Sequence, residues 1–148
     1  MSGPEGRLVN TPLKNGLARA ATTTLHWQRV EVWTDRGVPD VNFCYQGSEV
    51  WVECKFCLGK TDNAWQFTHP LTGPQVAFLM SRWAAGGSAY IMARRGDTFR
   101  LWAGNRAREV RATGFNTDGW LEQYDRPWNW TSILETLTQH RAHTSSGP

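Results

Sequence analysis

Two short runs of alternating apolar and polar residues, joined by Gln46-Gly47, constrain the fold of this chain most strongly. They lie in the stretch GVPDVNFCYQGSEVWVECKF, which runs from Gly37 to Phe56. Alternation with a period of two is typical of β-strands, and a two-residue loop that contains glycine favours a β-hairpin. We therefore predict strands over Val41 to Tyr45 and Glu49 to Phe56.

The hairpin brings two acids and an amine together. Counting outward from the Gln46-Gly47 loop places Asp40 opposite Glu53, with their Cβ atoms about 5 Å apart on one side of the sheet. Like charges at that distance destabilise a sheet unless something neutralises them. Lys55 follows Glu53 by two residues, so its ammonium group projects beside the same two carboxylates.

The two faces of the hairpin differ in character. The apolar face, predicted to join the core, carries Val41, Phe43, Val50, Val52, Cys54 and Phe56. The polar face carries Asp40, Asn42, Glu49, Glu53 and Lys55, with Trp51 as its apolar exception. The polar face is therefore the one on which chemistry is expected.

Two carboxylates and a lysine suit phosphodiester hydrolysis. Carboxylate oxygens are hard ligands that favour Mg²⁺ or Mn²⁺, and such ions also accept water and phosphate oxygens as ligands. A neighbouring lysine can orient or deprotonate an attacking water, while the cation stabilises charge on the phosphate. The alternative interpretation is an ion-paired strand surface, in which Lys55 bridges Asp40 and Glu53 and nothing reacts.

The rest of the chain predicts an α/β fold with a mixed central β-sheet flanked by helices. Further strands are expected over Leu25 to Trp33, Ser88 to Arg95 and Thr98 to Trp102. Helices are expected over Thr11 to Thr24, with Thr11 as N-cap, within Thr72 to Gly87, and within Pro127 to His140. The segment from Cys57 to Leu71 shows no period and is expected to be an exposed, mobile loop. Packing against the sheet is the favoured role of Trp128 and Trp130, and a dimer interface is the alternative.

Length and composition fit one soluble domain. A chain of 148 residues is long enough for one ordinary core. We expect flexible ends at residues 1–10 and 143–148 around a single nuclease-type domain at 11–142. The sequence has neither a signal-peptide pattern nor a run of about 20 apolar residues, so we expect a cytoplasmic protein with no membrane partner. Three cysteines make a disulfide framework improbable.

The motif residues are similar to those of a known superfamily. Gly37-Val38-Pro39-Asp40, then Glu53-Cys54-Lys55, and the downstream GPQVAFLMSRWAAGGSAYIMARR resemble the PD-(D/E)xK nuclease signature. The resemblance extends from Trp27 to Trp102. It points to the compact branch that includes archaeal-type Holliday-junction resolvases, VRR-type nuclease domains and small phage endonucleases.

The resemblance implies a restriction-endonuclease-like fold and a set of roles. Asp40 and Glu53 would be ligands of Mg²⁺, for which Mn²⁺ can substitute, and Lys55 would be the catalytic lysine. In many such domains a glutamine that opens the next helix contacts the site, and Gln75 has that place. The same residues from Thr72 to Gln75 also form a capping box, which is the alternative role of Gln75. His69, just before this helix, is a weaker candidate for reaching the scissile phosphate.

The chain departs from the family in one respect. The family usually supplies a further acid from the first helix, but Thr11 to Thr24 contains none. Glu31 is the substitute that we expect from the neighbouring strand, and a surface ion pair with Arg29 is its alternative role. Glu5 lies in the segment that is expected to fray.

Arginine and tryptophan supply the expected DNA contacts. The net charge of +3 permits a polyanionic partner, and nine tryptophans are available for stacking on unpaired bases. The arginines expected to contact phosphates are Arg29, Arg36, Arg82, Arg94 and Arg95. Each of them alone is an ordinary exposed arginine, so only the set as a whole favours DNA.

A zinc site is the competing metal hypothesis. Cys44, Cys54, Cys57 and His69 have the composition of a Cys3His site. Alternation argues against such a site, because Cys54 points to the core whereas Cys44 and Cys57 point to the opposite face.

The sequence therefore predicts an Mg²⁺-dependent DNA endonuclease, phage-encoded or phage-like, that acts on branched or distorted DNA during recombination in the host cytoplasm. A resolvase needs two active sites related by a twofold axis, so a homodimer is expected. Two alternatives stay open. One is a sequence-specific or homing-type nicking endonuclease, and the other is a non-catalytic DNA-binding protein of the same fold.

Overall fold

A computed structural model describes residues 5–30, 37–57 and 65–145, the side chains as far as residue 141. Its centre is a six-stranded sheet in the order β1-β2-β3-β4-β5-β6. The strands are β1 (Leu25–Arg29), β2 (Val41–Tyr45), β3 (Ser48–Cys57), β4 (Ser88–Arg95), β5 (Thr98–Ala103) and β6 (Glu122–Tyr124). The helices are α1 (Thr11–Ala20), α2 (Gly73–Ala84), α3 (Ala107–Thr113) and α4 (Trp130–Ser145). The predicted mixed sheet with flanking helices is confirmed.

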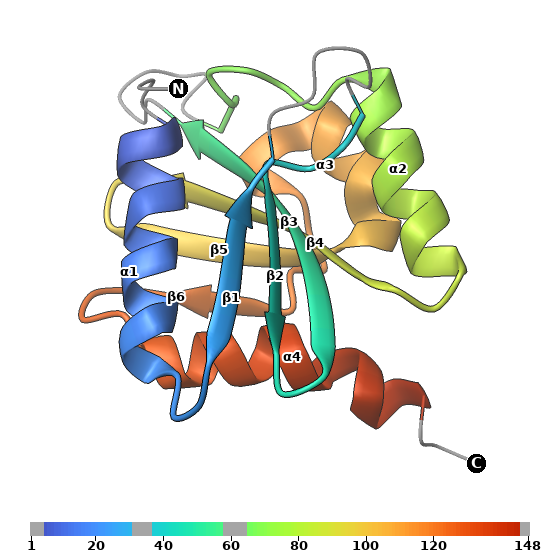
Figure 1. Ribbon diagram of the computed structural model, residues 1–148. Helices are drawn as coiled ribbons and strands as arrows, with labels where there is room; N and C mark the ends of the chain where they lie inside the picture. The colour runs from blue at the N-terminus through green and yellow to red at the C-terminus, as the bar shows by residue number, and fades with distance from the viewer. Residues whose placement is uncertain (1–4, 31–36, 58–64, 146–148) are drawn as a thin grey trace.

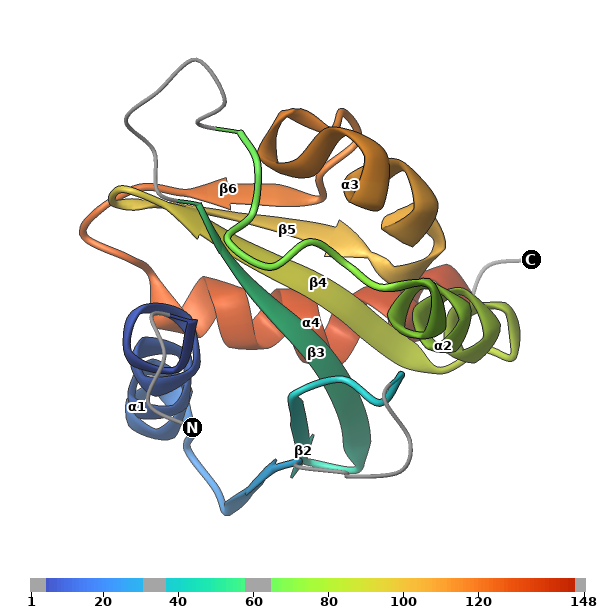
Figure 2. The same ribbon diagram turned by 90° about the horizontal axis from the view of Figure 1, so that it is seen from above.

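The sheet separates two cores (Figure 2). Helices α1 and α4 cover one face, where Val41, Phe43, Val50, Val52 and Cys54 pack with Leu13, Leu17 and Ile133. Helices α2 and α3 cover the other face, where Ile91, Ala93 and Trp102 pack with Val76, Leu79 and Val110. The predicted apolar face of the hairpin therefore belongs to the first core.

The strand directions explain the connections. β3 and β4 run parallel, whereas every other neighbouring pair is antiparallel. Parallel strands need a long crossover, and α2 supplies it between β3 and β4. The expected helix stop at Gly86-Gly87 is confirmed, since Gly86 has a φ of 94° and its N–H bonds to the Trp83 carbonyl at 3.0 Å.

The predicted hairpin is also confirmed. Phe43 pairs with Val50 and Tyr45 with Ser48 across β2 and β3. Gln46 and Gly47 form the loop, with φ angles of 49° and 81°. Positive φ at both loop residues gives the turn whose twist matches that of two antiparallel strands. The register that opposes Asp40 and Glu53 is thus set locally.

The N-terminal segment differs from the prediction. A π-helical turn, η1 (Gly6–Asn10), leads directly into α1, and Glu5 is already helical. Thr11 is therefore inside a helix rather than its N-cap. Val9 is fully buried in line with Leu13 and Leu17, at four-residue spacing, so this segment packs instead of fraying.

The prediction of an exposed loop from Cys57 to Leu71 is wrong in part. The stretch before α2 is not wholly an exposed loop, because Phe67 and Leu71 are buried and Phe67 bridges to Cys57. Residues 58–64 lie outside the described residues. The region after β5 contains α3, β6 and two 3₁₀ turns, η2 (Gly104–Arg106) and η3 (Gly114–Asn116), none of which was predicted from the sequence.

Trp128 and Trp130 pack against the sheet, which is the role favoured from the sequence. The rings of Trp128 and Trp130 lie 4.7 Å and 6.1 Å from the ring of Phe99 between their centroids. They fasten the start of α4 to β5. In the described residues no helix is long and apolar enough to cross a membrane.

Candidate active site

The candidate site consists of Asp40, Glu53 and Lys55. Asp40 lies at the start of β2, and Glu53 and Lys55 lie in the second half of β3. Asp40 directly precedes β2, and its Oδ2 accepts a hydrogen bond from the Cys54 backbone N–H at 3.2 Å. The Nζ of Lys55 lies 3.6 Å from Oε2 of Glu53. The Asp40 carboxyl group lies close enough to that of Glu53 to raise its pKa. The structure thus brings together the three residues that the hairpin register predicted.

Burial distinguishes these groups from an ordinary polar strand surface. Glu53 and Lys55 are only 1% and 3% exposed. Charged side chains are almost never buried so deeply unless they are paired, and their desolvation costs several kcal/mol per ion. A strand needs no such pair for folding, so the arrangement favours a functional site.

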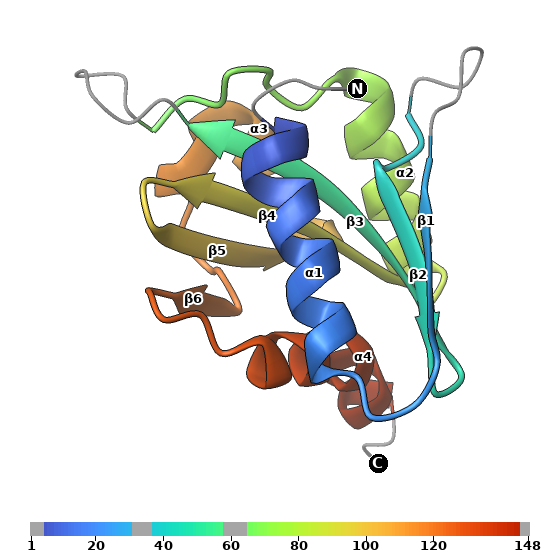
Figure 3. The ribbon, with the colours of Figure 1, turned by 60° about the vertical axis from the view of Figure 1, so that its left-hand side comes forward.

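Glu5 is a fourth member that the sequence reasoning set aside. Glu5 is only 8% exposed. Burial raises its pKa, the charges of Lys55 and His69 lower that pKa, and Asp40 raises it again. These effects put Glu5 within electrostatic range of the site. Figures 1 and 3 show the start of the N-terminal helix beside the carboxyl end of β3, against which η1 packs.

A sequence signal for Glu5 did exist. Glu5, Val9, Leu13 and Leu17 follow one another at four-residue spacing. That spacing lays all four on one face of a continuous helix. Extending the helix upstream of Thr11 would have supplied the acid that the superfamily resemblance calls for.

The carboxyl groups resist ionisation. Burial raises the pKa of Glu53 well above its usual range, and the nearby Asp40 carboxylate raises it further, against the opposing charge of Lys55. Burial also raises the pKa of Asp40, although the Cys54 N–H, Lys55 and Arg29 lower it. Two close carboxyl groups in a dry environment cannot both ionise cheaply. A bound cation would relieve this cost.

The residues present fit a hard divalent cation. Oε1 of Glu5 and Oε1 of Glu53 are buried, and neither has a hydrogen-bond donor among the described residues. Mg²⁺ characteristically uses one or two carboxylates and takes its other ligands from water and substrate. In residues 5–30, 37–57 and 65–141, no three His, Cys, Asp or Glu side chains form a metal cluster. The fit is therefore to the Asp40–Glu53 pair, and Glu5 is not counted as a ligand.

The other proposed site residues have different positions. Gln75 forms the capping box, since its Oε1 accepts from the Thr72 N–H at 3.0 Å and its own N–H donates to Thr72 Oγ1 at 3.2 Å. This confirms the alternative role of Gln75. Glu31 and Arg36 lie outside the described residues. Cys54 and Cys57 belong to opposite cores, as alternation predicted.

Arg94 departs from the expected phosphate-contacting role. It is 8% exposed. Its Nη1 donates to the Leu8 carbonyl at 2.9 Å, its Nε donates to the Gly96 carbonyl at 2.7 Å, and its guanidinium lies 4.8 Å from the Trp128 ring centroid. Arg94 is therefore a structural residue that joins η1 to the sheet. Arg29 and Arg95 are exposed.

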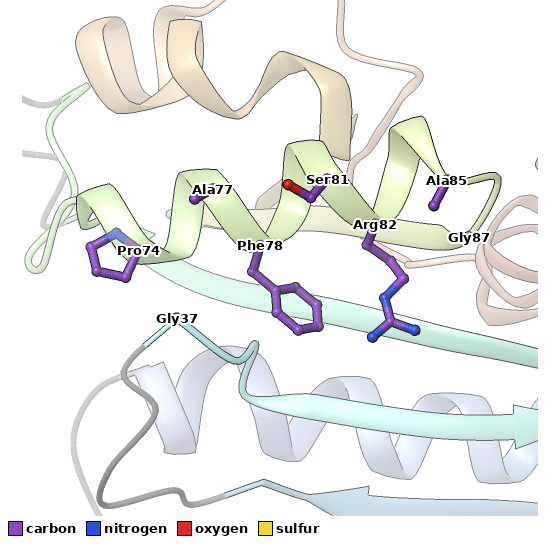
Figure 4. Close-up of a pocket in the computed structure, with 8 residues that line it drawn as sticks. All are labelled: Gly37, Pro74, Ala77, Phe78, Ser81, Arg82, Ala85 and Gly87. Atoms are coloured by element: carbon purple, nitrogen blue, oxygen red, sulfur yellow. The ribbon is translucent and has the colours of Figure 1, made fainter.

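Arg82 is exposed and lines a pocket of about 630 Å³ on α2 (Figure 4). Its guanidinium lies 5.1 Å from the Phe78 ring and 5.6 Å from the Trp51 ring. Phe78 and Arg82 point from α2 toward the side on which Gly37 lies. Trp51, the apolar exception on the polar face, is thus half covered by α2.

The fold is the α/β architecture that the resemblance to PD-(D/E)xK nucleases implied. No protein-family model matches the sequence, and no curated protein matches it either. One solved structure that shares the fold is Hjc from Archaeoglobus fulgidus, a Holliday junction resolvase from an archaeal hyperthermophile. It has 14% sequence identity and a TM-score of 0.50, and the match covers 87% of this chain and 99% of that chain. At this identity the likeness establishes the fold alone.

Proposed function

We propose that this protein is a divalent-metal-dependent DNA endonuclease that acts on branched DNA. The observation that carries the proposal is the buried Asp40–Glu53 pair beside Lys55, which is costly to fold and chemically suited to phosphodiester hydrolysis. The fold shared with a solved Holliday junction resolvase supports the choice of substrate. Glu5 adds the acid that the superfamily resemblance calls for.

Asp40 and Glu53 are the residues that would hold the cation, Mg²⁺ or Mn²⁺. When bound, such an ion supplies a more acidic water and stabilises charge on the phosphate oxygens. The backbone N–H of Cys54 fixes the direction of the Asp40 carboxylate. Because Asp40 is anchored in this way, its other oxygen keeps a defined orientation beside Glu53.

Lys55 and Glu5 act on water and phosphate. The Lys55 ammonium group is held beside Glu53 in a dry environment, where its charge and hydrogen-bond donors act more strongly than they would in water. We assign it to orienting the attacking water or a phosphate oxygen. Glu5, whose pKa is raised by burial, is assigned to accepting a hydrogen bond from water in the site.

Symmetric cleavage of a junction requires two sites. One chain carries one Asp40–Glu53–Lys55 site, so cutting two strands of like polarity calls for two copies related by a twofold axis. We therefore propose a homodimer on its substrate. Sedimentation of the protein with and without a four-way junction tests this assembly, and one chain per junction would contradict it.

The activity is tested on four substrates: a four-way junction, a nicked duplex, a single strand and a linear duplex. Each is incubated with Mg²⁺, with Mn²⁺ or with EDTA. We expect metal-dependent cleavage of the junction in preference to the linear duplex. Sequence-dependent nicking of the linear duplex would indicate a nicking endonuclease, and binding without cleavage in any metal would indicate a non-catalytic protein.

A further inference from the structure

A second pocket lies on the α1 side of the sheet, and Val41 in its lining is the residue after Asp40. It has a volume of about 270 Å³ and is lined by Asn10, Thr11, Lys14, Trp27, Arg29 and Val41. Val41 follows Asp40 in the chain, and the charge of Arg29 acts on the Asp40 carboxyl. Val41 points to the α1 side of the sheet, so the pocket lies on that side, near Asp40.

The lining residues suit an anion. Lys14 comes from α1 and Arg29 from the end of β1, and both are exposed. None of the described lining residues is acidic. Two cations that approach one pocket from separate elements form a suitable contact for a phosphate group.

The same pocket also offers contacts for a base or sugar. Trp27 is half-buried, and its ring stacks on Phe43 at 6.1 Å between centroids with an interplanar angle of 10°. Asn10 is 6% exposed, and its Oδ1 has no hydrogen-bond donor among the described residues. A buried acceptor of this kind favours a ligand, or a water held by a ligand, that donates to it.

The volume of the pocket limits the ligands that it can hold. About 270 Å³ is close to the lower limit of roughly 300 Å³ for pockets that hold small organic molecules. Such a volume suits a single nucleotide unit rather than a stacked duplex. A nucleotide can enter it only when its base leaves the stack, which is easiest at a branch point or a distortion.

We propose that this pocket is the subsite for an unstacked nucleotide next to the scissile phosphate, with Lys14 and Arg29 on its phosphate and Trp27 and Asn10 against its base and sugar. The proposal rests on the proposed endonuclease function and deepens it. It gives the enzyme a physical reason to prefer branched DNA, since a continuous duplex leaves the subsite without a ligand.

The first test compares Lys14→Ala with Arg19→Ala. Both side chains are exposed on α1 and each variant removes one positive charge, but only Lys14 lines the pocket. We expect Lys14→Ala to weaken junction binding about tenfold and to reduce the slope of log K against log[salt] by about one. Arg19→Ala should stay within about twofold of the wild type. Equal losses in the two variants would overturn the proposal.

The second test locates the phosphate. Uncharged methylphosphonate groups are placed singly at positions around the cut in the junction. At one position adjacent to the scissile phosphate, the methylphosphonate should lower the affinity of the wild-type protein. At that position it should not lower the affinity of Lys14→Ala further, because this variant already lacks the contact. If the two losses multiply at every position, Lys14 does not contact that phosphate and the proposal fails.

The third test addresses the base. Trp27→Leu keeps an apolar side chain on Phe43 but removes the aromatic ring, and Trp120→Leu is the control at an exposed tryptophan outside the pocket. We expect Trp27→Leu to reduce the preference for junction over linear duplex about tenfold. An unchanged preference would overturn the assignment of the base contact.

The outcomes distinguish a failure of the subsite proposal from a failure of the endonuclease proposal. If the wild type cuts no DNA in Mg²⁺ or Mn²⁺, the proposed function fails and the subsite fails with it. If the wild type cuts the junction and Lys14→Ala and Trp27→Leu cut it equally well, the endonuclease stands and the subsite alone is wrong.

Discussion

Lys55 Nζ lies 3.6 Å from Glu53 Oε2 inside β3, and both side chains are almost wholly buried. A buried pair of this kind is costly for folding, although its charges suit catalysis. Removing one partner of a buried pair leaves an uncompensated charge, whereas replacing both with apolar residues of similar volume removes the desolvation cost. The pair is therefore expected to lower stability while it enables catalysis.

The double variant Glu53→Leu with Lys55→Met tests this trade-off. We expect its free energy of unfolding to equal that of the wild type or to exceed it by about 1–4 kcal/mol, with no cleavage activity. Urea unfolding measures the first quantity and junction cleavage the second. A marked loss of stability in the double variant would mean that the pair has a structural purpose.

The Lys55→Ala variant separates chemistry from binding. We expect cleavage of a four-way junction to fall by at least about 100-fold, because the variant loses the group that orients water or phosphate. Binding in EDTA should change less than about threefold, since Lys55 is buried and contributes little to the long-range field. Arg19→Ala is the control for a lost positive charge. Wild-type rates from Lys55→Ala would remove Lys55 from the site.

Stability should depend on pH in a direction set by the buried acids. The pKa values of Glu53, Asp40 and Glu5 are all raised in the folded protein, chiefly by burial. The ordinary pKa values are 4.5 for glutamate and 3.8 for aspartate. At a pH between these values and the raised pKa values of the folded protein, the folded state binds more protons than the unfolded state. The stability that these groups contribute is present at low pH and is lost as the pH rises through the folded pKa values.

We therefore expect the melting temperature in EDTA to fall between pH 5 and pH 8, and to recover when Mg²⁺ is added at pH 8. Glu53→Gln, which cannot ionise, should fall less steeply. Glu109→Gln is the control, because Glu109 is exposed on α3. Parallel pH profiles for the wild type and Glu53→Gln would contradict the assignment of the slope to this site.

Glu5→Gln tests the acid at the start of the N-terminal helix. The change keeps the size of the side chain and removes its charge, so we expect the fold to persist and junction cleavage to fall at least about tenfold. Binding in EDTA should be retained. Far-ultraviolet circular dichroism checks the helix, and cleavage kinetics check the role. A rate equal to that of the wild type would show that Glu5 only packs.

The sequence predicts this site well where local geometry sets it. A two-residue loop with positive φ at Gln46 and Gly47 fixes the register of β2 and β3, and the register fixes the neighbourhood of Asp40 and Glu53. These relationships span few residues and obey simple counting rules. The same is true of the α2 start, where the capping box is visible in the sequence.

The features that were not predicted from the sequence depend on packing between segments that are far apart in the chain. Glu5 enters the site because η1 packs on β3, and Arg94 is buried because it donates to the carbonyl of Leu8, 86 residues away in the chain. The contact of Arg94 leaves no periodic trace near that residue. For Glu5, the four-residue spacing with Val9, Leu13 and Leu17 indicates the helix that carries it but not the strand on which that helix packs. β6 has only three residues, and pairing with β5 defines it rather than its own sequence.

Adjacent arginines give the sharpest contrast between structural and DNA-binding roles. Arg94 is buried, donates to the Leu8 and Gly96 carbonyls and lies on Trp128, whereas Arg95 is exposed at the end of β4. Arg94→Ala should lower the free energy of unfolding by about 2–3 kcal/mol, because charge-assisted hydrogen bonds and buried contacts are lost. Arg95→Ala should change it by less than about 0.5 kcal/mol.

The two variants should separate again on DNA. Arg95→Ala is expected to weaken junction binding and to lower the salt slope by about one, as for the loss of a single phosphate contact. Arg94→Ala should keep the wild-type slope under conditions in which it is folded, but it should lose cleavage, because the Leu8 carbonyl that it holds lies three residues from Glu5. Urea unfolding, salt-dependent binding and cleavage kinetics of the two proteins measure these effects. An unstable Arg95→Ala protein, or a reduced salt slope in Arg94→Ala, would reverse the roles assigned to this pair.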